Sequence, residues 1–253
     1  MLIGNQVPDF IVATATNAKE DNMREIETKR LFLRKLRSDD AESIFRNWAS
    51  DSEVAKYVTW NVHKDINETK AILDMWLAEY DNDNCYRYGI ENKADGELIG
   101  MIDVVGYYHE NPVIGYCSCR RYWGNGYMTE ALGAVMKELA EDGFDTFVIE
   151  AADDNVASNK VILKNGFKLV DKRDDRISEM KPQVVTINSY IMLTDKLTSR
   201  PCGGCCLSLR FYEIISILYS IFMRFSFNFI RHPPQLFHCG CDFCIHSLFH
   251  GGQ

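Results

Sequence analysis

The order of strand-like and helix-like segments between residues 30 and 193 constrains the fold of this chain more than any other feature. The expected strands are 30–36, 85–91, 98–105, 113–119, 147–151, 167–171 and 184–193, and the expected helices are 38–48, 65–77, 124–143 and 155–165. Strands 85–91 and 98–105 are predicted to form a hairpin, because turn-forming residues separate them. Helices separate several of the other strands, and a sheet that combines a hairpin with helical crossovers is mixed. We therefore predict an α/β fold with a mixed, mostly antiparallel central sheet flanked by helices, rather than a doubly wound parallel sheet.

Composition divides the chain into three parts. Six of the nine cysteines and four of the six histidines lie after Arg200, and the last lysine is Lys196. Residues 1–199 hold 24 Lys and Arg against 34 Asp and Glu, whereas residues 200–253 hold four Arg against two acidic residues. One globular unit rarely changes so abruptly. We expect an N-terminal extension at 1–22, a globular domain at 23–197, and a tail rich in cysteine and aromatic residues at 198–253 that is not part of the domain.

Two alternatives apply to the tail. Cys-x-x-Cys pairs at 202–205 and 241–244, together with His238 and His246, are ligand types that suit zinc. The segment between them has no finger pattern, so we expect no metal. The stretch 211–230 is long enough to span a bilayer, but the charged residues Glu213 and Arg224 interrupt it. A tail anchor and a non-native extension both remain open, and membrane association is not expected.

Charge and cysteine content bound the class of protein. The formal net charge is −8, which argues against a nucleic-acid-binding protein because such a protein carries a basic face. Residues 1–22 lack the basic and apolar regions of a secretory signal. Only Cys85, Cys117 and Cys119 lie in the domain, which is ordinary for a reducing compartment. We expect a cytoplasmic protein.

The segment 121–127, Arg-Tyr-Trp-Gly-Asn-Gly-Tyr, joins an expected strand to an expected helix. Gly124 and Gly126 allow a tight turn and close approach of a ligand to the main chain. Free N–H groups at the positive end of a helix bind phosphate, and Arg120 and Arg121 can add charge-assisted contacts. The segment matches neither a P-loop nor a dinucleotide fingerprint. By spacing alone, a phosphate site and a ligand-free turn are equally good interpretations.

Two motifs carry a resemblance to a known family. Arg121-x-x-Gly124-x-Gly126 resembles the Q/R-x-x-G-x-G/A signature of GNAT acetyltransferases, and the string 114–131, beginning Ile-Gly-Tyr, is similar to the branch that includes ribosomal-protein N-terminal acetyltransferases. The block 155–167, Asn-Val-Ala-Ser-Asn-Lys-Val-Ile-Leu-Lys-Asn-Gly-Phe, is similar to a second element of that branch. The resemblance covers roughly residues 23–193.

The resemblance implies a GNAT fold with splayed strands and an acetyl-CoA cosubstrate. In that family, the strand at 116–119 holds the pantetheine arm, the glycine loop holds the pyrophosphate, and the start of the 155–165 helix lines the other side of the cofactor. The implied cofactor-binding residues are Cys117, Ser118, Arg121, Gly124, Asn125, Gly126, Tyr127, Asn155 and Ser158. For Asn155 and Ser158 the alternative is a helix cap and a surface hydroxyl.

The implied reaction is transfer of an acetyl group from acetyl-CoA to the primary amine of a peptide N-terminus or a small molecule, by a monomer or a homodimer. A carboxylate must accept the amine proton. Asp103 is our first choice, ahead of Glu150 and Glu130, although a solvent-facing strand aspartate explains Asp103 equally well. The glutamate that many relatives carry before Ile-Gly-Tyr is Val113 here, so that base is missing.

The remaining assignments are open. Ser158 is our choice for the proton donor to the thiolate, because the tyrosine that many GNAT enzymes use is Ile162 here. Cys117 and Cys119 are better explained as ordinary strand cysteines than as nucleophiles. Aromatic residues fall where such domains build the acceptor cleft, although core packing also explains them; they are Trp48, Tyr57, Trp60 and Trp76. The alternative functions are a non-catalytic acyl-CoA-binding module and a protein in which the tail has the main role.

Overall fold

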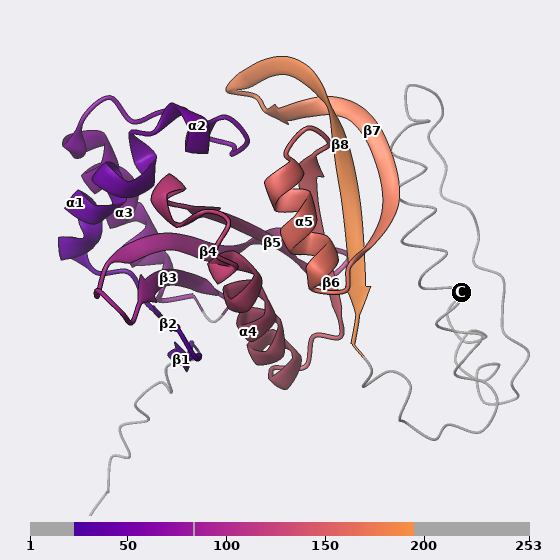
Figure 1. The fold of residues 1–253 in the computed structure, drawn as a ribbon, viewed down its shortest axis with the longest axis horizontal. Coiled ribbons are helices and arrows are strands. Elements are labelled where there is room, and N and C mark those ends of the chain that lie inside the picture. Colours follow the sequence, from indigo (N-terminus) through magenta and orange to yellow (C-terminus); the bar gives the residue numbers. More distant parts are fainter. Residues whose placement is uncertain (1–22, 83, 195–253) are drawn as a thin grey trace, which may run out of the picture. The chain divides into compact units, whose positions relative to one another are not determined.

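The computed structural model describes residues 23–82 and 84–194 of the chain, and Figure 1 shows how they are arranged. The strands are β1 (Ile26–Glu27), β2 (Leu31–Arg34), β3 (Arg87–Asn92), β4 (Leu98–Tyr108), β5 (Asn111–Ser118), β6 (Thr146–Ala152), β7 (Lys168–Ser178) and β8 (Lys181–Leu193). The helical segments are η1 (Ser38–Asp40), α1 (Ala41–Ile44), η2 (Phe45–Ala49), α2 (Ser52–Ala55), α3 (Ile66–Glu79), η3 (Arg120–Tyr122), α4 (Tyr127–Glu141) and α5 (Val156–Lys164).

The described strands form one eight-stranded sheet in the order β1-β2-β3-β4-β5-β6-β8-β7. Each neighbouring pair in this sheet is antiparallel except β5 and β6, which run parallel. The parallel pair arises because α4 connects β5 to β6 as a crossover. The prediction of a mixed, mostly antiparallel α/β fold is confirmed.

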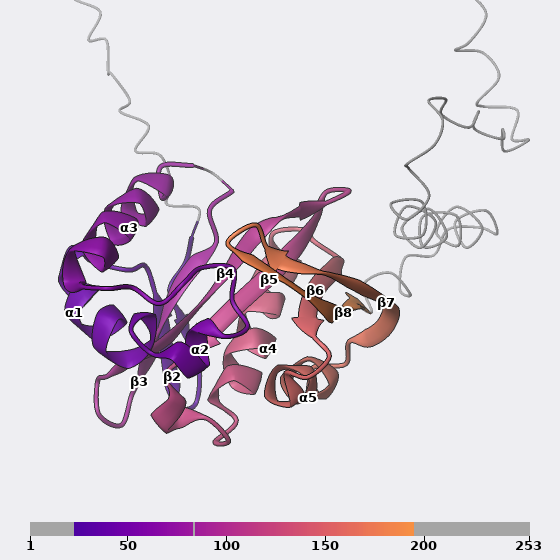
Figure 2. The same ribbon diagram turned by 90° about the horizontal axis from the view of Figure 1, so that it is seen from above.

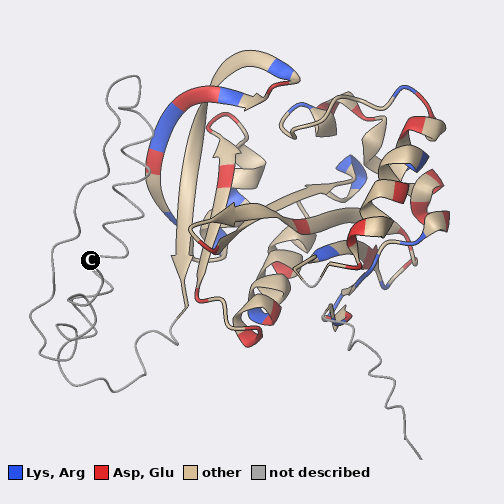
Figure 3. Cartoon of the chain, turned by 180° about the vertical axis from the view of Figure 1, so that it is seen from behind, with Lys and Arg blue, Asp and Glu red and all other residues tan. Residues whose placement is uncertain are grey.

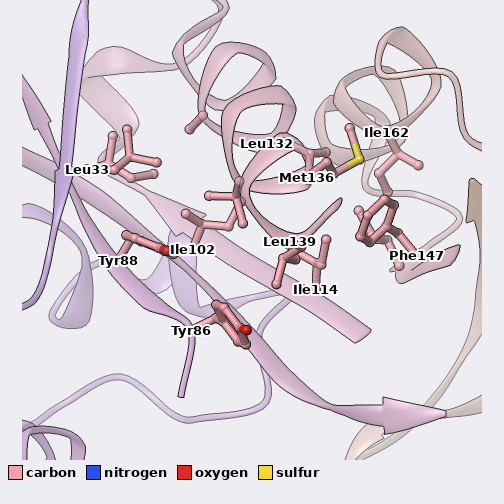
Figure 4. Packing of buried hydrophobic residues seen from close by; sticks show 14 of the residues in the cluster. Leu33, Tyr86, Tyr88, Ile102, Ile114, Leu132, Met136, Leu139, Phe147 and Ile162 are labelled. Atoms are coloured by element: carbon pink, nitrogen blue, oxygen red, sulfur yellow. The ribbon is translucent and has the colours of Figure 1, made fainter. Parts of the chain in front are cut away.

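Helices cover both faces of this sheet, and Figure 2 shows the sheet between them. The larger hydrophobic cluster joins the sheet to α4 and α5, and Figure 4 shows Ile102 and Ile114 of the sheet beside Leu132 and Leu139 of α4. A second cluster joins the other face to the segments from α1 to α3 through residues such as Trp48 and Leu73. Successive side chains of β4 and β5 therefore point to opposite faces of the sheet, one face packed against α4 and α5 and the other against the segments from α1 to α3.

The structure differs from the sequence prediction at several elements, and the short β1 and α2 were not predicted. The last two strands extend to Ser178 and from Lys181, which makes the final hairpin much longer than expected. The segment predicted as one helix at 38–48 consists of a 3-10 turn, an α-helical turn and a π-helical turn. Helix α4 begins at Tyr127 rather than Gly124, because η3 and the glycine loop separate it from β5.

The expectations for 1–22 and for the tail lie outside the described residues. Within the part that is described, no helix has the length and apolar character that crossing a bilayer requires. The same part contains no group of three His, Cys, Asp or Glu side chains placed to hold a metal ion. Acidic and basic residues are interspersed along the described chain, and the long β7 carries a run of both signs (Figure 3).

Candidate functional site

The central feature of the site is a gap between β5 and β6. The two parallel strands share a single registered pair, Val113 with Val148, and they diverge beyond it. The gap belongs to a cavity of about 1200 Å³ that is lined from both strands, from the glycine loop and from the start of α5. Main-chain groups that face the gap are left without a partner strand, and an extended amide-bearing ligand can pair with such an edge.

The direction of the main chain decides which groups of β5 face this gap. The Cys119 N–H donates to the carbonyl oxygen of Ile99 in β4 at 2.7 Å, and the Ser118 carbonyl instead accepts from Trp123 Nε1 at 2.9 Å. Because directions alternate along a strand, the amides of Tyr116 and Ser118 face the gap and that of Cys117 faces β4. Of the two cofactor-binding residues predicted on this strand, Cys117 and Ser118, only Ser118 therefore has a main-chain N–H that faces the gap.

The cysteines of β5 and its C-terminal end do not form a nucleophilic site. Cys117 and Cys119 are both buried, with free thiols. Burial raises the pKa of the Cys117 thiol, and the nearby Asp103 carboxylate raises it further. A thiol in that environment stays protonated and unreactive. This agrees with the expectation that these are ordinary strand cysteines.

The glycine loop presents a row of free amides. Gly124 and Gly126 both have φ near 77°, in the left-handed region, and Gly126 is the N-cap of α4. No main-chain N–H from Gly124 to Thr129 donates to any group in the described ranges. Consecutive free N–H groups at a helix N-terminus form a site for a phosphate group. The loop therefore presents free amides at a helix N-terminus, and its role in binding the pyrophosphate stays a prediction.

Side chains on both sides fix the shape of this loop. Asn125 Nδ2 donates to the carbonyls of Tyr122 and Trp123, at 3.2 and 3.1 Å. Arg30 Nη1 donates to the Asn125 carbonyl at 2.8 Å, and its guanidinium lies 4.4 Å from the centre of the Tyr127 ring. The Arg30 Nε also pairs with Glu130 at 2.6 Å. Arg30 was missed by the sequence analysis because it precedes the loop by almost a hundred residues.

The two arginines before the loop have different surroundings. Arg120 Nε forms an ion pair with Asp51 at 3.0 Å. Arg121 makes a long hydrogen bond from Nη2 to Asn47 Oδ1, at 3.4 Å, and its guanidinium lies near the Tyr122 ring. Arg121 is otherwise exposed. Arg121 is therefore better placed than Arg120 to add positive charge to an anion at the loop.

Asn155 and Ser158 lie at the start of α5, on the cavity wall opposite the glycine loop. The Asn155 side-chain oxygen accepts from the Ser158 N–H at 3.2 Å, so this residue is a helix cap. Its Nδ2 remains available to donate into the cavity. The Ser158 hydroxyl is hydrogen-bonded to the Tyr116 hydroxyl at 2.8 Å, so it is more than a surface group.

Tyr116 is the second residue of the site that the sequence analysis did not single out. It lines the cavity from β5, and burial raises the pKa of its hydroxyl far above the usual value. A hydroxyl with a raised pKa stays protonated and holds a proton beside Ser158. The residue stood in the Ile-Gly-Tyr string, but only folding shows that it reaches a serine 42 positions later.

Asp103 occupies the floor of the cavity on the face covered by α1 and α3. Its side chain accepts from Arg87 Nε at 3.1 Å, and Arg87 also pairs with Glu79 at 2.6 Å. Asp103 is 8% exposed, so the interpretation as a solvent-facing aspartate is wrong. Desolvation raises the pKa of Asp103 to about 6, although Arg87 pulls it down. A carboxyl group with that pKa is suited to accept a proton near neutral pH.

The two other carboxylates are engaged elsewhere. Glu150 lines the cavity but pairs with Arg173 at 2.7 Å. Glu130 accepts from the Thr28 hydroxyl and from Arg30, so it supports the outside of the glycine loop. Neither has the burial of Asp103.

The four aromatic residues predicted for an acceptor cleft all line the same cavity, on the side of α1 to α3; they are Trp48, Tyr57, Trp60 and Trp76. Trp48 is almost completely buried and also belongs to the core cluster on that face. Trp76 supports the Arg87 guanidinium, which lies 5.3 Å from its ring centre. Cleft lining and core packing are thus combined in these residues.

Comparison with known proteins agrees with this geometry. Residues 30–168 match the family model described as the acetyltransferase (GNAT) domain. The chain is 32% identical over 146 residues to the uncharacterized N-acetyltransferase YoaA of Bacillus subtilis, covering 56% of this chain and 82% of that protein.

Two solved structures show the same fold. One is RimL, a ribosomal-protein alpha-N-acetyltransferase in complex with coenzyme A, with a TM-score of 0.61 and 22% identity over 68% of this chain and 99% of that one. The other is the microcin self-immunity acetyltransferase MccE in complex with acetyl-CoA and AMP, with a TM-score of 0.58 and 20% identity over 66% and 94%. With a matching family model over more than half of its length, the chain belongs to the GNAT acetyltransferase family.

Proposed function

We propose that this protein transfers an acetyl group from acetyl-CoA to a primary amine by direct attack of the amine. The observation that carries the proposal is the row of free amides at 124–129 beside the open edge of β5. The first feature suits a diphosphate and the second suits an amide-rich arm, and coenzyme A contains both groups. The catalytic domain in this proposal is 23–197, and its free thiols are consistent with a cytoplasmic location.

The bound thioester supplies an activated carbonyl: the amine nitrogen forms a bond to the carbonyl carbon, the C–S bond breaks, the nitrogen loses a proton, and the sulfur gains one. Ser118 N–H faces the gap and would polarise the carbonyl oxygen. Arg121 and the amides from Gly124 to Tyr127 would hold the diphosphate. Asn155 would donate to the arm of the cosubstrate from α5.

Asp103 is the proposed acceptor of the amine proton, directly or through water. It lies on the acceptor side of the sheet and is the cross-strand partner of Gly115 in β5. A Cβ atom at Gly115 would lie 3.6 Å from Asp103 Oδ1 and 2.7 Å from Val105 Cγ1. The Val105 side chain occupies the space over Gly115, and Asp103 and Gly115 both line the cavity that would hold the amine.

The protonation state of Asp103 predicts how kcat/KM depends on pH. Its pKa in the fold is raised to about 6, so the carboxyl group is protonated below that pH and cannot accept a proton. At a constant concentration of neutral amine, kcat/KM is expected to rise with pH through about 6 and to level off above it. Asp103→Asn is expected to remove this rise with pH and to lower the value of kcat/KM above pH 6 by about 100-fold. Glu150→Gln is the matched control, because Glu150 lines the same cavity. If the rise of kcat/KM with pH survives in D103N and disappears in E150Q, Glu150 rather than Asp103 accepts the amine proton.

Arg30 is a positioning residue for the glycine loop, because it holds the Asn125 carbonyl and packs on Tyr127. Arg30→Ala is expected to weaken acetyl-CoA binding by about tenfold, through loss of a charge-assisted hydrogen bond that fixes the loop. Calorimetric titration would measure this, with Lys29→Ala as the control because it removes the same charge at an exposed neighbour. Equal weakening in both variants would mean that only net charge matters.

The test of the proposed function is acetyl-CoA titration followed by thiol release on a panel of amines, using the full chain. Binding in the micromolar range and thiol release that depends on the amine are the expected results. Binding without release on any amine would favour a non-catalytic acyl-CoA-binding module. The observation behind that second candidate is that Val113 and the fully buried Ile162 stand at two positions where relatives carry acid and base groups. Failure to bind acetyl-CoA would rule out both functions.

A further inference from the structure

The acceptor side of the cavity has its own chemistry, which the acetyl donor does not require. It lies on the face of the sheet that α1 to α3 cover, whereas the glycine loop and Ser158 lie toward α4 and α5. Its wall is apolar and largely aromatic, formed by Trp48, Val54, Trp60 and Trp76.

Asp103 lines the cavity beside this wall and belongs to a cluster of charged side chains with a negative excess. Arg87 lies between two carboxylates, Glu79 at 2.6 Å and Asp103 at 3.1 Å, so one negative charge has no matching cation within the cluster. Away from this cluster the cavity is also lined by Arg173, which is paired with Glu150, and by Arg176 on the same strand. Close to Asp103, where two carboxylates share one arginine, a cation therefore meets an attractive local field.

The far end of the cavity is roofed by the β7–β8 hairpin, which Figure 1 shows arching toward α2. The Ser178 hydroxyl donates to the Thr59 carbonyl at 2.7 Å, and the Lys181 ammonium donates to the Ala55 carbonyl. These contacts join the hairpin to the segment that carries Tyr57 and Trp60. A roof of this kind limits the size of the acceptor that the wall can enclose.

We infer that the acceptor is a small primary monoamine with an apolar or aromatic body, whose ammonium group is drawn to the Glu79–Arg87–Asp103 cluster and whose body packs on Trp76 and Trp60. This inference rests on the proposed acetyl transfer, and it adds the substrate class. Aromatic and aliphatic groups gain free energy when they leave water for such a wall, whereas a hydroxyl or carboxylate loses its hydration there without a partner.

Thiol release by the full chain with saturating acetyl-CoA tests this. The amines are 2-phenylethylamine, ethanolamine, β-alanine and a short peptide with a polar first residue. The expected kcat/KM for 2-phenylethylamine exceeds that for ethanolamine by about 50-fold, a factor that corresponds to burial of the ring, and β-alanine is the poorest substrate. Equal or faster reaction of ethanolamine, β-alanine or the peptide would overturn the substrate class while leaving acetyl transfer intact. No release with any of the four, or with the broader panel, would overturn acetyl transfer itself.

A pair of substitutions tests whether the aromatic wall recognises the acceptor amine. Trp76→Leu is expected to reduce the preference for 2-phenylethylamine over ethanolamine by about tenfold, and Met75→Leu, the exposed neighbour on α3, is expected to preserve it. Trp60→Leu provides a second variant, because Trp60 is half-buried like Trp76 and lies elsewhere on the wall. If a folded W76L and a folded W60L both keep the full preference, the aromatic wall does not recognise the acceptor.

Discussion

Replacing both Gly124 and Gly126 with valine is expected to weaken acetyl-CoA binding by at least about 100-fold, because several charge-assisted hydrogen bonds are lost together. Both glycines have φ near 77°, where a β-branched residue is strained. A Cβ atom at Gly124 meets nothing within 4 Å, and one at Gly126 meets only an Arg30 nitrogen at 3.6 Å. The cost is therefore conformational rather than steric. The loop must relax to another backbone conformation, and its N–H groups then no longer converge on one anion.

The matched control is Gly143→Val. Gly143 follows the other end of the same helix, has φ 105°, and a Cβ atom there would also meet nothing within 4 Å. It shares the backbone strain, which is about 1–2 kcal/mol, but not the anion site. Calorimetric titration with acetyl-CoA and thermal unfolding should be measured on all three proteins. Comparable unfolding temperatures with loss of binding only in the loop variant are expected. Unchanged affinity in a folded G124V/G126V protein would remove the basis of the proposed function.

The sequence predicted the elements that surround this loop because their patterns are strong. Strand 113–119 and the helix after it have apolar residues at clear periods, and the glycines mark the junction between them. The long β7 was missed beyond Asp171, because Lys172 to Arg176 is a charged run on an edge strand with no alternating pattern to detect. Helix α2 has only four residues, too few for a periodic signal.

The chemistry of the site was harder to predict than its location. Charged residues on a strand normally point to solvent, so the burial of Asp103 depends on Arg87, which reaches it from the neighbouring strand. Periodicity within one strand contains no such cross-strand information. In the same way, Arg30 acts on the glycine loop from the turn that follows β1, and its contact with Asn125 follows only from the packing of distant segments.

Tyr116→Phe is expected to lower kcat by about 100-fold while leaving acetyl-CoA affinity unchanged. Ser158 alone is a poor acid because of its high intrinsic pKa, but the Tyr116 hydroxyl lies 2.8 Å from its oxygen. We propose that Ser158 passes its proton to the departing thiolate while the Tyr116 hydroxyl passes its proton to the Ser158 oxygen, and that solvent then reprotonates Tyr116; burial raises the pKa of Tyr116, so its hydroxyl is protonated before the step. Removing only the Tyr116 oxygen interrupts this transfer and preserves the packing of the ring.

Three further variants separate this role from a structural one. Ser158→Ala is expected to reduce kcat by a similar factor, and the double variant S158A/Y116F should be little worse than either single variant, because both residues act in one chain. Tyr190→Phe is the matched control, since this buried tyrosine donates to Asn159 Oδ1 at 2.6 Å and not to Ser158. The control should lose some stability but keep its kcat. If Y116F and Y190F have the same small effect on kcat, Tyr116 only supports the fold, and the proton for the thiolate comes from solvent.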